Sequence, residues 1–375
     1  MKIKGKIFID TLTAISKIAI KSNSTEDANT ILMYCTDGAV QLIASNSNVQ
    51  VATKLTAEST NSEKTSFSLN LGDLVKQLPA IFDTKDKEGI LFIEKVGNEV
   101  KFKAIGELSF PIVGNKTSEF KKIDDSEFSV SFMGYDLVSA INATSLATHA
   151  FNEVMCNTKI AFDANAESLN LIAMNGILLV IHDLPLEDMN CEKPSVSALV
   201  DGKALKSICN TLELMENSEI KITFTDDYVG LSSGELKVVL PIKKTNFVAY
   251  EKLLDTAFDY SVVFNIKDFK KTITATKKVV KDKISYKYDG TNAYLIASGF
   301  SKPVNVVSSD VVDFTLPIDL ISNILSKTSG TTIKFRIAKA GLIEVTSPEN
   351  DVLKYITSHC RWIHKTTKED EGWDY

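Results

Sequence analysis

Arginine is almost absent from this chain, which carries its positive charge on lysine. Only Arg336 and Arg361 stand among the 42 basic residues of the 375-residue sequence. Lysine is a point charge that suits phosphate groups, whereas the planar fork of arginine can read guanine in a DNA groove. A nucleic-acid partner would therefore be bound without recognition of its sequence, and with strong dependence on salt.

The usual catalytic and phosphate-binding signatures are also missing. Neither G-x-x-x-x-G-K-[ST] nor G-x-G-x-x-G occurs, and the sequence contains no H-E-x-x-H or G-x-S-x-G. The acid pairs Asp226-Asp227 and Asp124-Asp125 leave open a metal-assisted enzyme, but both lie in turn-like polar surroundings where aspartate is common. We expect no catalytic residue, no metal and no cofactor.

The five cysteines are odd in number and form no C-x-x-C pair, which argues against a disulfide framework or a zinc ribbon. His359, Cys360 and His364 are three possible metal ligands, but their neighbours resemble a last strand and a tail. We interpret the cysteines as reduced, mostly buried thiols.

Long hydrophobic runs are absent as well. Nowhere do eighteen apolar residues follow one another, and Met1–Ile7 has no apolar core or cleavage site of a secretory signal. We expect a soluble, cytoplasmic protein without a membrane partner.

What the sequence does contain is a repeat. The triplet Leu-Ile-Ala recurs at nearly even spacing, at Leu42–Ala44, Leu171–Ala173 and Leu295–Ala297. A tripeptide can recur by chance, so the flanking segments must show whether a longer unit is repeated. Before each triplet an apolar run leads into a helical pattern, at Phe8–Ala19, Phe132–Thr144 and Phe264–Thr276, and a second helical pattern follows each triplet. The same order three times indicates three copies of one unit.

Short strands rich in β-branched and aromatic residues fill the rest of each copy, at Ile90–Glu94, Val100–Ala104, Ile220–Phe224, Lys237–Leu240 and Ile333–Ile337. The predicted fold class is α+β, with two helices on a mostly antiparallel sheet in each copy. A polar linker follows the first copy. We predict domains at 1–124, 125–256 and 257–363, and a tail at 364–375.

Positive charge gathers on the predicted helices although the net charge is −6. In the third copy Phe269, Ile273, Thr276 and Val280 share one side of a helix at about 100° per residue. Lysines fall on the opposite side, and equivalent helices carry others, so that the candidate DNA-facing set is Lys17, Lys21, Lys76, Lys203, Lys206, Lys270, Lys271, Lys277, Lys278 and Lys281.

A lysine-rich solvated face is the ordinary explanation for any one such helix. Recurrence on equivalent helices favours a surface that faces phosphates. Aromatic residues do not alternate with these lysines as they would on a platform for single strands, which favours duplex DNA as the ligand.

Several segments together resemble a known family, the bacterial sliding clamp or β subunit of DNA polymerase III. They are the three repeats, Phe67–Leu69 before the helix that ends at Gln77–Pro79, Leu171–Gly176, and Asn246–Leu254. The resemblance covers nearly the whole chain and rests on the order of features, since no single motif is diagnostic. It implies a head-to-tail homodimer that forms a ring of six domains, with helices lining the hole and sheets outside.

The resemblance implies a processivity factor without chemistry of its own. Such a ring encircles double-stranded DNA without reading its sequence, and it tethers DNA polymerase and the clamp loader through short peptide motifs. The competing hypothesis is a scaffold that keeps the fold but has lost the ring or its role on DNA. The sequence leaves open whether two or three chains close the ring.

Two sites carry over by position. The pocket for partner peptides would comprise Met174, Gly176, Leu179, Val248, Leu253, Ile356, Ser358 and Cys360, for which simple core packing is an equally good explanation. Three segments depart from the family. Met174–Leu179 stands for the usual Thr-Asp-Gly-His-Arg-Leu, Val248–Tyr250 for Pro-Asp-Tyr, and Ser358–Trp362 for Met-Pro-Met-Arg-Leu.

The second site is the dimer interface between the first domain of one chain and the third of the next. Its residues would be Phe110, Ile112, Val279 and Val280, and Pro111 suits an edge strand. For the tail, we predict that the aromatic residues Trp373 and Tyr375 dock on a pocket or a partner.

Overall fold

The apolar spacing of the helices determines which face each one buries. In the computed structural model of the protein, Phe8, Leu12, Ile15 and Ile18 of the first helix are all at most 1% exposed. The helices are α1 (Gly5–Ala19), α2 (Leu71–Gln77), α3 (Gly134–Thr144), α4 (Gly202–Leu212), α5 (Glu251–Leu254), α6 (Ile266–Thr276) and α7 (Ile318–Lys327). None in the described part of the chain is long and apolar enough to span a membrane.

The structure describes residues 1–19, 29–58, 64–83, 85–86, 88–114, 120–121, 123, 128–148, 152, 154–163, 167–191, 195–212 and 218–359. These residues form two compact units. The first comprises Met1–Ala173 and Asp183–Phe247, and the second comprises Met174–His182 and the chain from Val248 onward. Lys21, Asp124, Asp125, Cys360, His364, Trp373 and Tyr375 lie outside the described residues.

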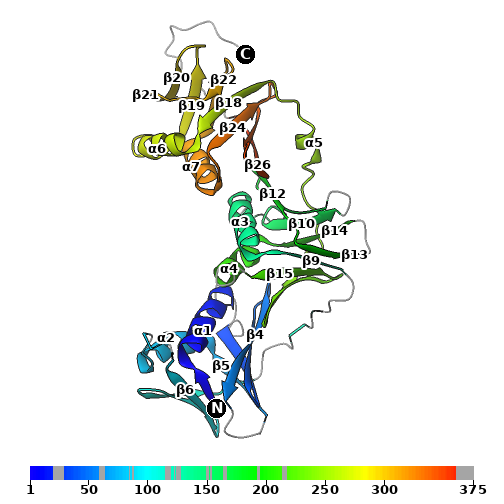
Figure 1. The fold of residues 1–375 in the computed structure, drawn as a ribbon, viewed down its shortest axis with the longest axis vertical. Helices are drawn as coiled ribbons and strands as arrows, with labels where there is room; N and C mark the ends of the chain where they lie inside the picture. Colours follow the sequence, from blue (N-terminus) through cyan, green and yellow to red (C-terminus); the bar gives the residue numbers. More distant parts are fainter. Residues whose placement is uncertain are drawn as a thin grey trace. The chain divides into compact units, whose positions relative to one another are not determined.

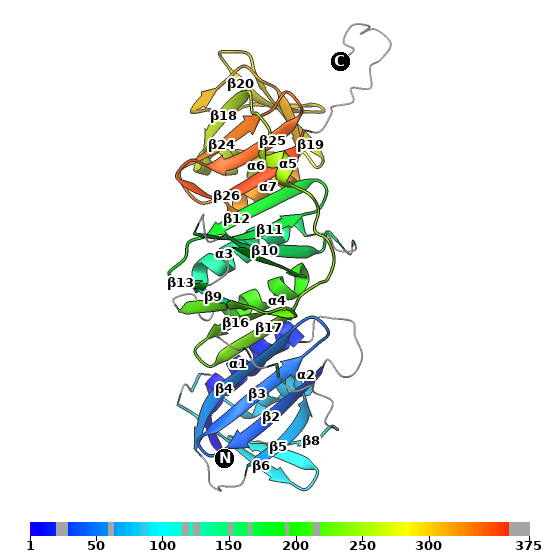
Figure 2. The same ribbon diagram turned by 90° about the vertical axis from the view of Figure 1, so that its right-hand side faces the viewer.

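Antiparallel strands dominate the first unit. They are β1 (Lys2–Lys4), β2 (Thr30–Thr36), β3 (Ala39–Ser45), β4 (Gln50–Glu58), β5 (Thr65–Asn70), β6 (Ile90–Val96), β7 (Glu99–Lys103), β8 (Glu107–Pro111), β9 (Phe128–Met133), β10 (Asn157–Asp163), β11 (Ser168–Met174), β13 (Asp188–Cys191), β14 (Ser195–Asp201), β15 (Glu219–Phe224), β16 (Tyr228–Ser233) and β17 (Leu236–Pro241). One sheet has the order β13-β9-β15-β16-β17-β4-β1-β6-β7-β8, with β3, β2 and β5 continuing from β4. Helices α1, α3 and α4 lie along one side of these strands (Figures 1 and 2).

The second unit has two sheets. The part of the nine-stranded sheet that belongs to this unit has the order β12-β26-β25-β24-β18-β22, and the four-stranded sheet has the order β21-β20-β19-β23. The strands are β12 (Leu178–Leu184), β18 (Tyr260–Asn265), β19 (Lys283–Tyr288), β20 (Ala293–Ala297), β21 (Phe300–Pro303), β22 (Ser308–Ser309), β23 (Phe314–Pro317), β24 (Thr332–Ile337), β25 (Leu342–Ser347) and β26 (Asn350–Ser358).

The order of elements repeats three times, which confirms the tandem arrangement predicted from the sequence. The series β1-α1-β2-β3-β4-β5-α2-β6-β7-β8 recurs from β9 to β17 and from β18 to β26, with β13 and β22 as additions. The Leu-Ile-Ala triplets lie on the equivalent strands β3, β11 and β20. Pairing repeats as well, because β1–β6, β9–β15 and β18–β24 are matching antiparallel pairs. We refer to the three series as copies one, two and three.

A close approach of backbone to the start of α4 requires a glycine. Gly202 donates its N–H to Cys156 O at 2.9 Å. A Cβ atom at Gly202 would lie 2.7 Å from that same oxygen and 2.6 Å from Thr148 Cγ2, closer than real Cβ contacts. The main chain must shift to admit even a methyl group.

We therefore expect Gly202→Ala to lower the free energy of unfolding by about 1 to 3 kcal/mol, the usual cost of overpacking. Urea denaturation followed by circular dichroism measures the change. Gly114→Ala is the matched control, because no atom of the described residues lies within 4 Å of the added Cβ there. Equal destabilisation of the two variants would contradict this account of the helix start.

Candidate nucleic-acid interface

The rotation of α6 is set by an aromatic cluster in the second unit. Phe269 of α6 stacks on Phe264 of β18 with ring centroids 4.0 Å apart, and it meets Phe335 of β24 edge-on at 6.0 Å. All three rings are buried, as are Ile273 and Thr276 on the same face of the helix. Because this face is held in the core, the opposite face of α6 must point to solvent.

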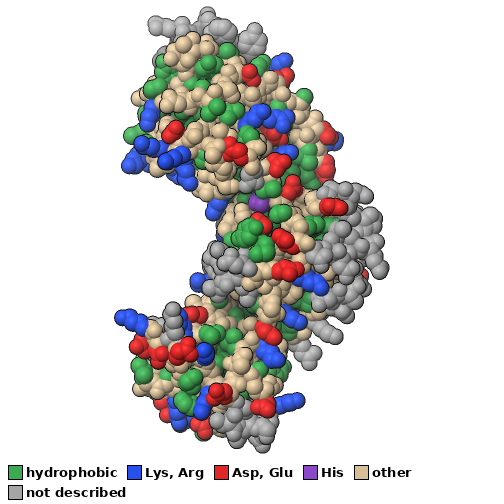
Figure 3. Space-filling model, in the orientation of Figure 1, with side chains coloured by type: hydrophobic (Ala, Val, Ile, Leu, Met, Phe, Trp, Pro, Cys, Tyr) green, Lys and Arg blue, Asp and Glu red, His purple; other side chains and the backbone are tan. Residues whose placement is uncertain are grey.

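That exposed face is cationic. Lys270 and Lys271 of α6 are exposed, as is Lys278 in the turn that follows the helix, and basic side chains gather over α6 in Figure 3. Lys267 is exposed on the same face and was missed in the sequence, although it lies three and four residues before two of these lysines, a spacing that places them together on a helix. The helix thus presents a row of ammonium groups to the solvent.

Two further lysines of this region have partners within the chain. Lys277 Nζ lies 2.6 Å from Asp319 Oδ1 on α7, and Lys281 Nζ donates to Lys277 O at 3.0 Å. The first contact joins α6 to α7 and offsets part of the charge of Lys277. Lys270, Lys271 and Lys278 are therefore the better candidates for contact with phosphates.

The first unit places its lysines on equivalent helices. Lys17 of α1, Lys76 of α2 and Lys203 of α4 are exposed. Lys206 of α4 is half-buried and donates to Asn142 Oδ1 of α3. Since α1 packs against both α2 and α4, and α4 against α3, these helices form one layer that carries the basic residues.

Of the two acid pairs in the alternative metal hypothesis, Asp226-Asp227 lies in the described part of the chain. Asp227 is well exposed, with its Oδ1 3.6 Å from Lys244 Nζ, and Asp226 O accepts a hydrogen bond from the same lysine. Within the described ranges no group of three or more His, Cys, Asp or Glu residues is placed to hold a metal ion.

Two segments of the predicted peptide pocket, those on β12 and β26, pair with each other. Leu179 and Ile356 are cross-strand partners, and both are buried. The turn before β12 is closed by Asn175, whose Oδ1 accepts from Leu178 N at 2.9 Å. Gly176 in that turn has a φ of 85°, a conformation that glycine adopts without strain. Because the side chains of Leu179 and Ile356 are buried, a peptide has little access to them.

Other residues of this set are more accessible. Met174, Val248 and Leu253 are half-buried, and Ser358 is exposed at the end of β26. Two apolar side chains not assigned to the pocket from sequence are also exposed, Ile177 at 61% and Leu254 at 41%. Their exposure is a tertiary property that the sequence pattern does not encode.

The four predicted interface residues differ in accessibility. Phe110 of β8 is buried and packs edge-on against Phe102 at 5.5 Å, and Val280 is buried as well. Val279 is 67% exposed, and Ile112 is half-buried. The more telling feature is the backbone, because β8 and β21 each end a sheet in the described structure. The edge at β21 was not predicted.

This chain is similar to known proteins in its fold but not in its sequence. No family model matches the sequence, and no curated protein matches it either. Solved structures match almost the entire chain. The DNA polymerase III subunit beta of Pseudomonas aeruginosa is 12% identical, with a TM-score of 0.83, over 96% of this chain and 100% of that one.

Two further solved structures agree. The DNA polymerase III beta subunit of Thermotoga maritima is 14% identical with a TM-score of 0.83, over 96% of this chain and 99% of that one. The Helicobacter pylori beta clamp bound to a DNA ligase peptide is 13% identical with a TM-score of 0.80, again over 96% and 99%. The protein thus has the fold of the bacterial sliding clamps, the β subunits of DNA polymerase III, in a sequence far removed from theirs.

Proposed function

We propose that this protein is a DNA sliding clamp, a ring that encircles duplex DNA and tethers a polymerase and other partners. The observation that carries the proposal is the way in which successive copies are joined by backbone pairing. β4 of copy one pairs with β17, the last strand of copy two. β12 of copy two pairs in the same manner with β26, the last strand of copy three.

One pairing of this series is left over within the chain. The equivalent of β4 and β12 in copy three is β21, and the equivalent of β17 and β26 in copy one is β8. Both are edges in the described structure, and an edge strand presents unpaired backbone groups to a second chain. The joint that this chain uses twice would therefore be made a third time between chains, head to tail, and such a heterologous contact can close into a ring.

The pairing of copies one and two also predicts the register of this joint. Lys237 lies opposite Ala52 in β17 and β4. Gly106-Glu107-Leu108 matches Gly234-Glu235-Leu236 in sequence, so that Ser109 is equivalent to Lys237. The partners Ala44↔Val51 and Ala297↔Phe300 make Ser301 equivalent to Ala52. We infer that Ser109 of one chain faces Ser301 of the next.

Oxidation of a Ser109→Cys, Ser301→Cys variant should therefore link chains covalently. Directly opposed residues of antiparallel strands have Cα atoms about 4.5 to 5.5 Å apart, which a disulfide can bridge. On a non-reducing gel we expect a discrete dimer, because a closed ring of two chains offers no further ends. Each single variant is the control and should stay unlinked. A ladder of higher species would indicate an open filament, and the absence of linkage would contradict the proposed joint.

The lysine face of α6 supplies the contact with DNA. Phosphate contacts by lysine release counterions and hold any sequence equally, while topology keeps the ring on the duplex. The weak, sequence-independent surface is compatible with sliding. We propose the same role for the lysines on α1, α2 and α4, because these helices are the equivalents of α6 and α7 in the other copies.

Reversal of the charges on α6 and in the turn after it should abolish retention on nicked circular DNA. The variant carries Lys270→Glu, Lys271→Glu and Lys278→Glu, and its salt dependence should become shallower by about 0.9 in slope for each phosphate that lysine no longer neutralises. The control carries the same charge change on exposed strand residues, Lys54→Glu, Lys95→Glu and Lys237→Glu. Gel filtration with labelled circles measures retention. Equal retention of both variants would rule out α6 as the DNA-facing element.

Partner peptides are the remaining part of the proposal. A DNA ligase peptide is bound to the similar H. pylori beta clamp. In this chain we propose that Met174, Val248 and Leu253, with Ile177 and Leu254, receive peptides of the polymerase and the clamp loader.

We further propose the domain limits 1–124, 125–256 and 257–363. We also propose that the protein acts in the cytoplasm.

A further inference from the structure

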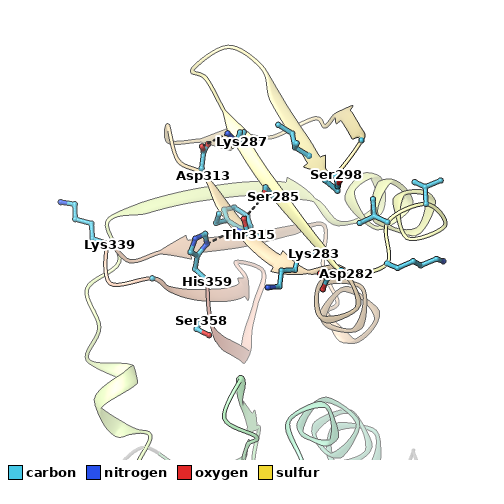
Figure 4. Close-up of a pocket in the computed structure, with 18 of the residues that line it drawn as sticks. Asp282, Lys283, Ser285, Lys287, Ser298, Asp313, Thr315, Lys339, Ser358 and His359 are labelled. Carbon is cyan, nitrogen blue, oxygen red and sulfur yellow. Dashed lines mark hydrogen bonds and ion pairs between the residues drawn. The ribbon is translucent and has the colours of Figure 1, made fainter. Parts of the chain in front are cut away.

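A groove of about 1550 Å³ opens in the second unit between β19 and β23 on one side and the ends of β25 and β26 on the other (Figure 4). Its walls combine apolar and basic side chains. Val280, Ile296 and Phe314 are among the apolar residues, and Lys281, Lys283, Lys287 and Lys339 are the lysines. A groove of this volume is too large for most small molecules and suits a length of peptide.

Positive charge prevails in the groove. Four lysines face two acids, Asp282 and Asp313. Lys287 Nζ lies 3.9 Å from Asp313 Oδ2, and Lys339 pairs outside the groove with Asp259 at 3.3 Å. Lys283 has no ion pair with any residue that the structure describes. The groove therefore favours an occupant that is both acidic and partly apolar.

The end of β26 is fastened to this groove at His359. The N–H of His359 donates to Gly341 O at 2.6 Å, and its Nδ1 accepts from Thr315 N at 2.9 Å. Burial lowers the pKa of His359 below its ordinary value, so that the neutral ring can accept this bond at pH 7. His359 is the last described residue, and it lines the groove.

The sequence that follows has the composition that the groove favours. Residues Glu369–Tyr375 read Glu-Asp-Glu-Gly-Trp-Asp-Tyr, which joins four acids to two aromatic rings and contains no basic residue. They begin ten positions after His359. A chain can span about 3.3 Å per residue, so this segment can reach any point of the groove to which it is tethered.

We propose that Glu369–Tyr375 docks in this groove of the same chain, with Trp373 against the apolar wall and the acids facing Lys283 and Lys287. Tethering raises the local concentration of the segment, so that even weak contacts suffice to keep the groove filled. The groove includes Val279 and Val280, which the sequence predicts to be part of the interface between chains, and Gly299, which precedes β21. The docked segment would therefore sit next to the surface that closes the ring. The proposal does not depend on DNA binding.

The two tryptophans of the chain make this testable in the full-length protein. They are Trp362 and Trp373, so Trp362→Phe leaves Trp373 as the only one. Acrylamide, a neutral quencher, then reports the exposure of Trp373. In this background we expect a blue-shifted, protected emission. Adding Lys283→Glu and Lys287→Glu should lower the docking constant at least about tenfold, or 1.4 kcal/mol, and expose the ring.

Matched variants separate docking from misfolding. Lys327→Glu with Lys334→Glu changes the same charge in the same unit outside the groove and should leave Trp373 protected. Neutralising the segment instead, by Glu369→Gln, Asp370→Asn and Glu371→Gln, cannot disturb the groove and should expose Trp373. Equal quenching in all variants would overturn the proposal. Protection that disappears on dilution would assign the groove to the segment of a second chain, and would overturn docking within the same chain.

Discussion

The structure depends on hydrogen bonds between the edge strands of neighbouring copies, because an edge strand carries unpaired backbone N–H and C=O groups. Each copy has two edges that can pair with another copy, one on its fourth strand and one on its last, and two such pairings occur within the chain, at β4–β17 and β12–β26. The unpaired N–H and C=O groups of such an edge can pair with another strand. In the described structure the corresponding strands β8 and β21 stand at the ends of their sheets.

Packing of the helices against the core also determines where the positive charge of each copy lies. The stacked rings of Phe264 and Phe269 fix the apolar face of α6 against the core. The lysines on the opposite face of the helix therefore point to solvent. In copy one, Phe8 of α1 approaches Phe102 with centroids 6.1 Å apart, which anchors the equivalent helix. A protein of net negative charge can thus have basic helices, because each helix buries its apolar face and exposes its lysines on the opposite face.

Local periodicity explains what could be predicted from the sequence. The Leu-Ile-Ala strands, the two helices of each copy and the strands near Ile90, Ile220 and Ile333 follow from apolar spacing over a few residues. The pairing of β12 with β26 joins residues far apart in the chain, and no local signal encodes it. For the same reason the burial of Leu179 and Ile356, the exposure of Ile177 and Leu254, and the free edge at β21 emerged only from the structure.

Electron microscopy of the purified protein at micromolar concentration tests the central claim most directly. Two chains joined head to tail through β8 and β21 should appear as closed annuli with an open centre, and their mass should correspond to two chains of 41.2 kDa. Particles of single chains without a central opening, under conditions in which the protein is folded, would contradict the account.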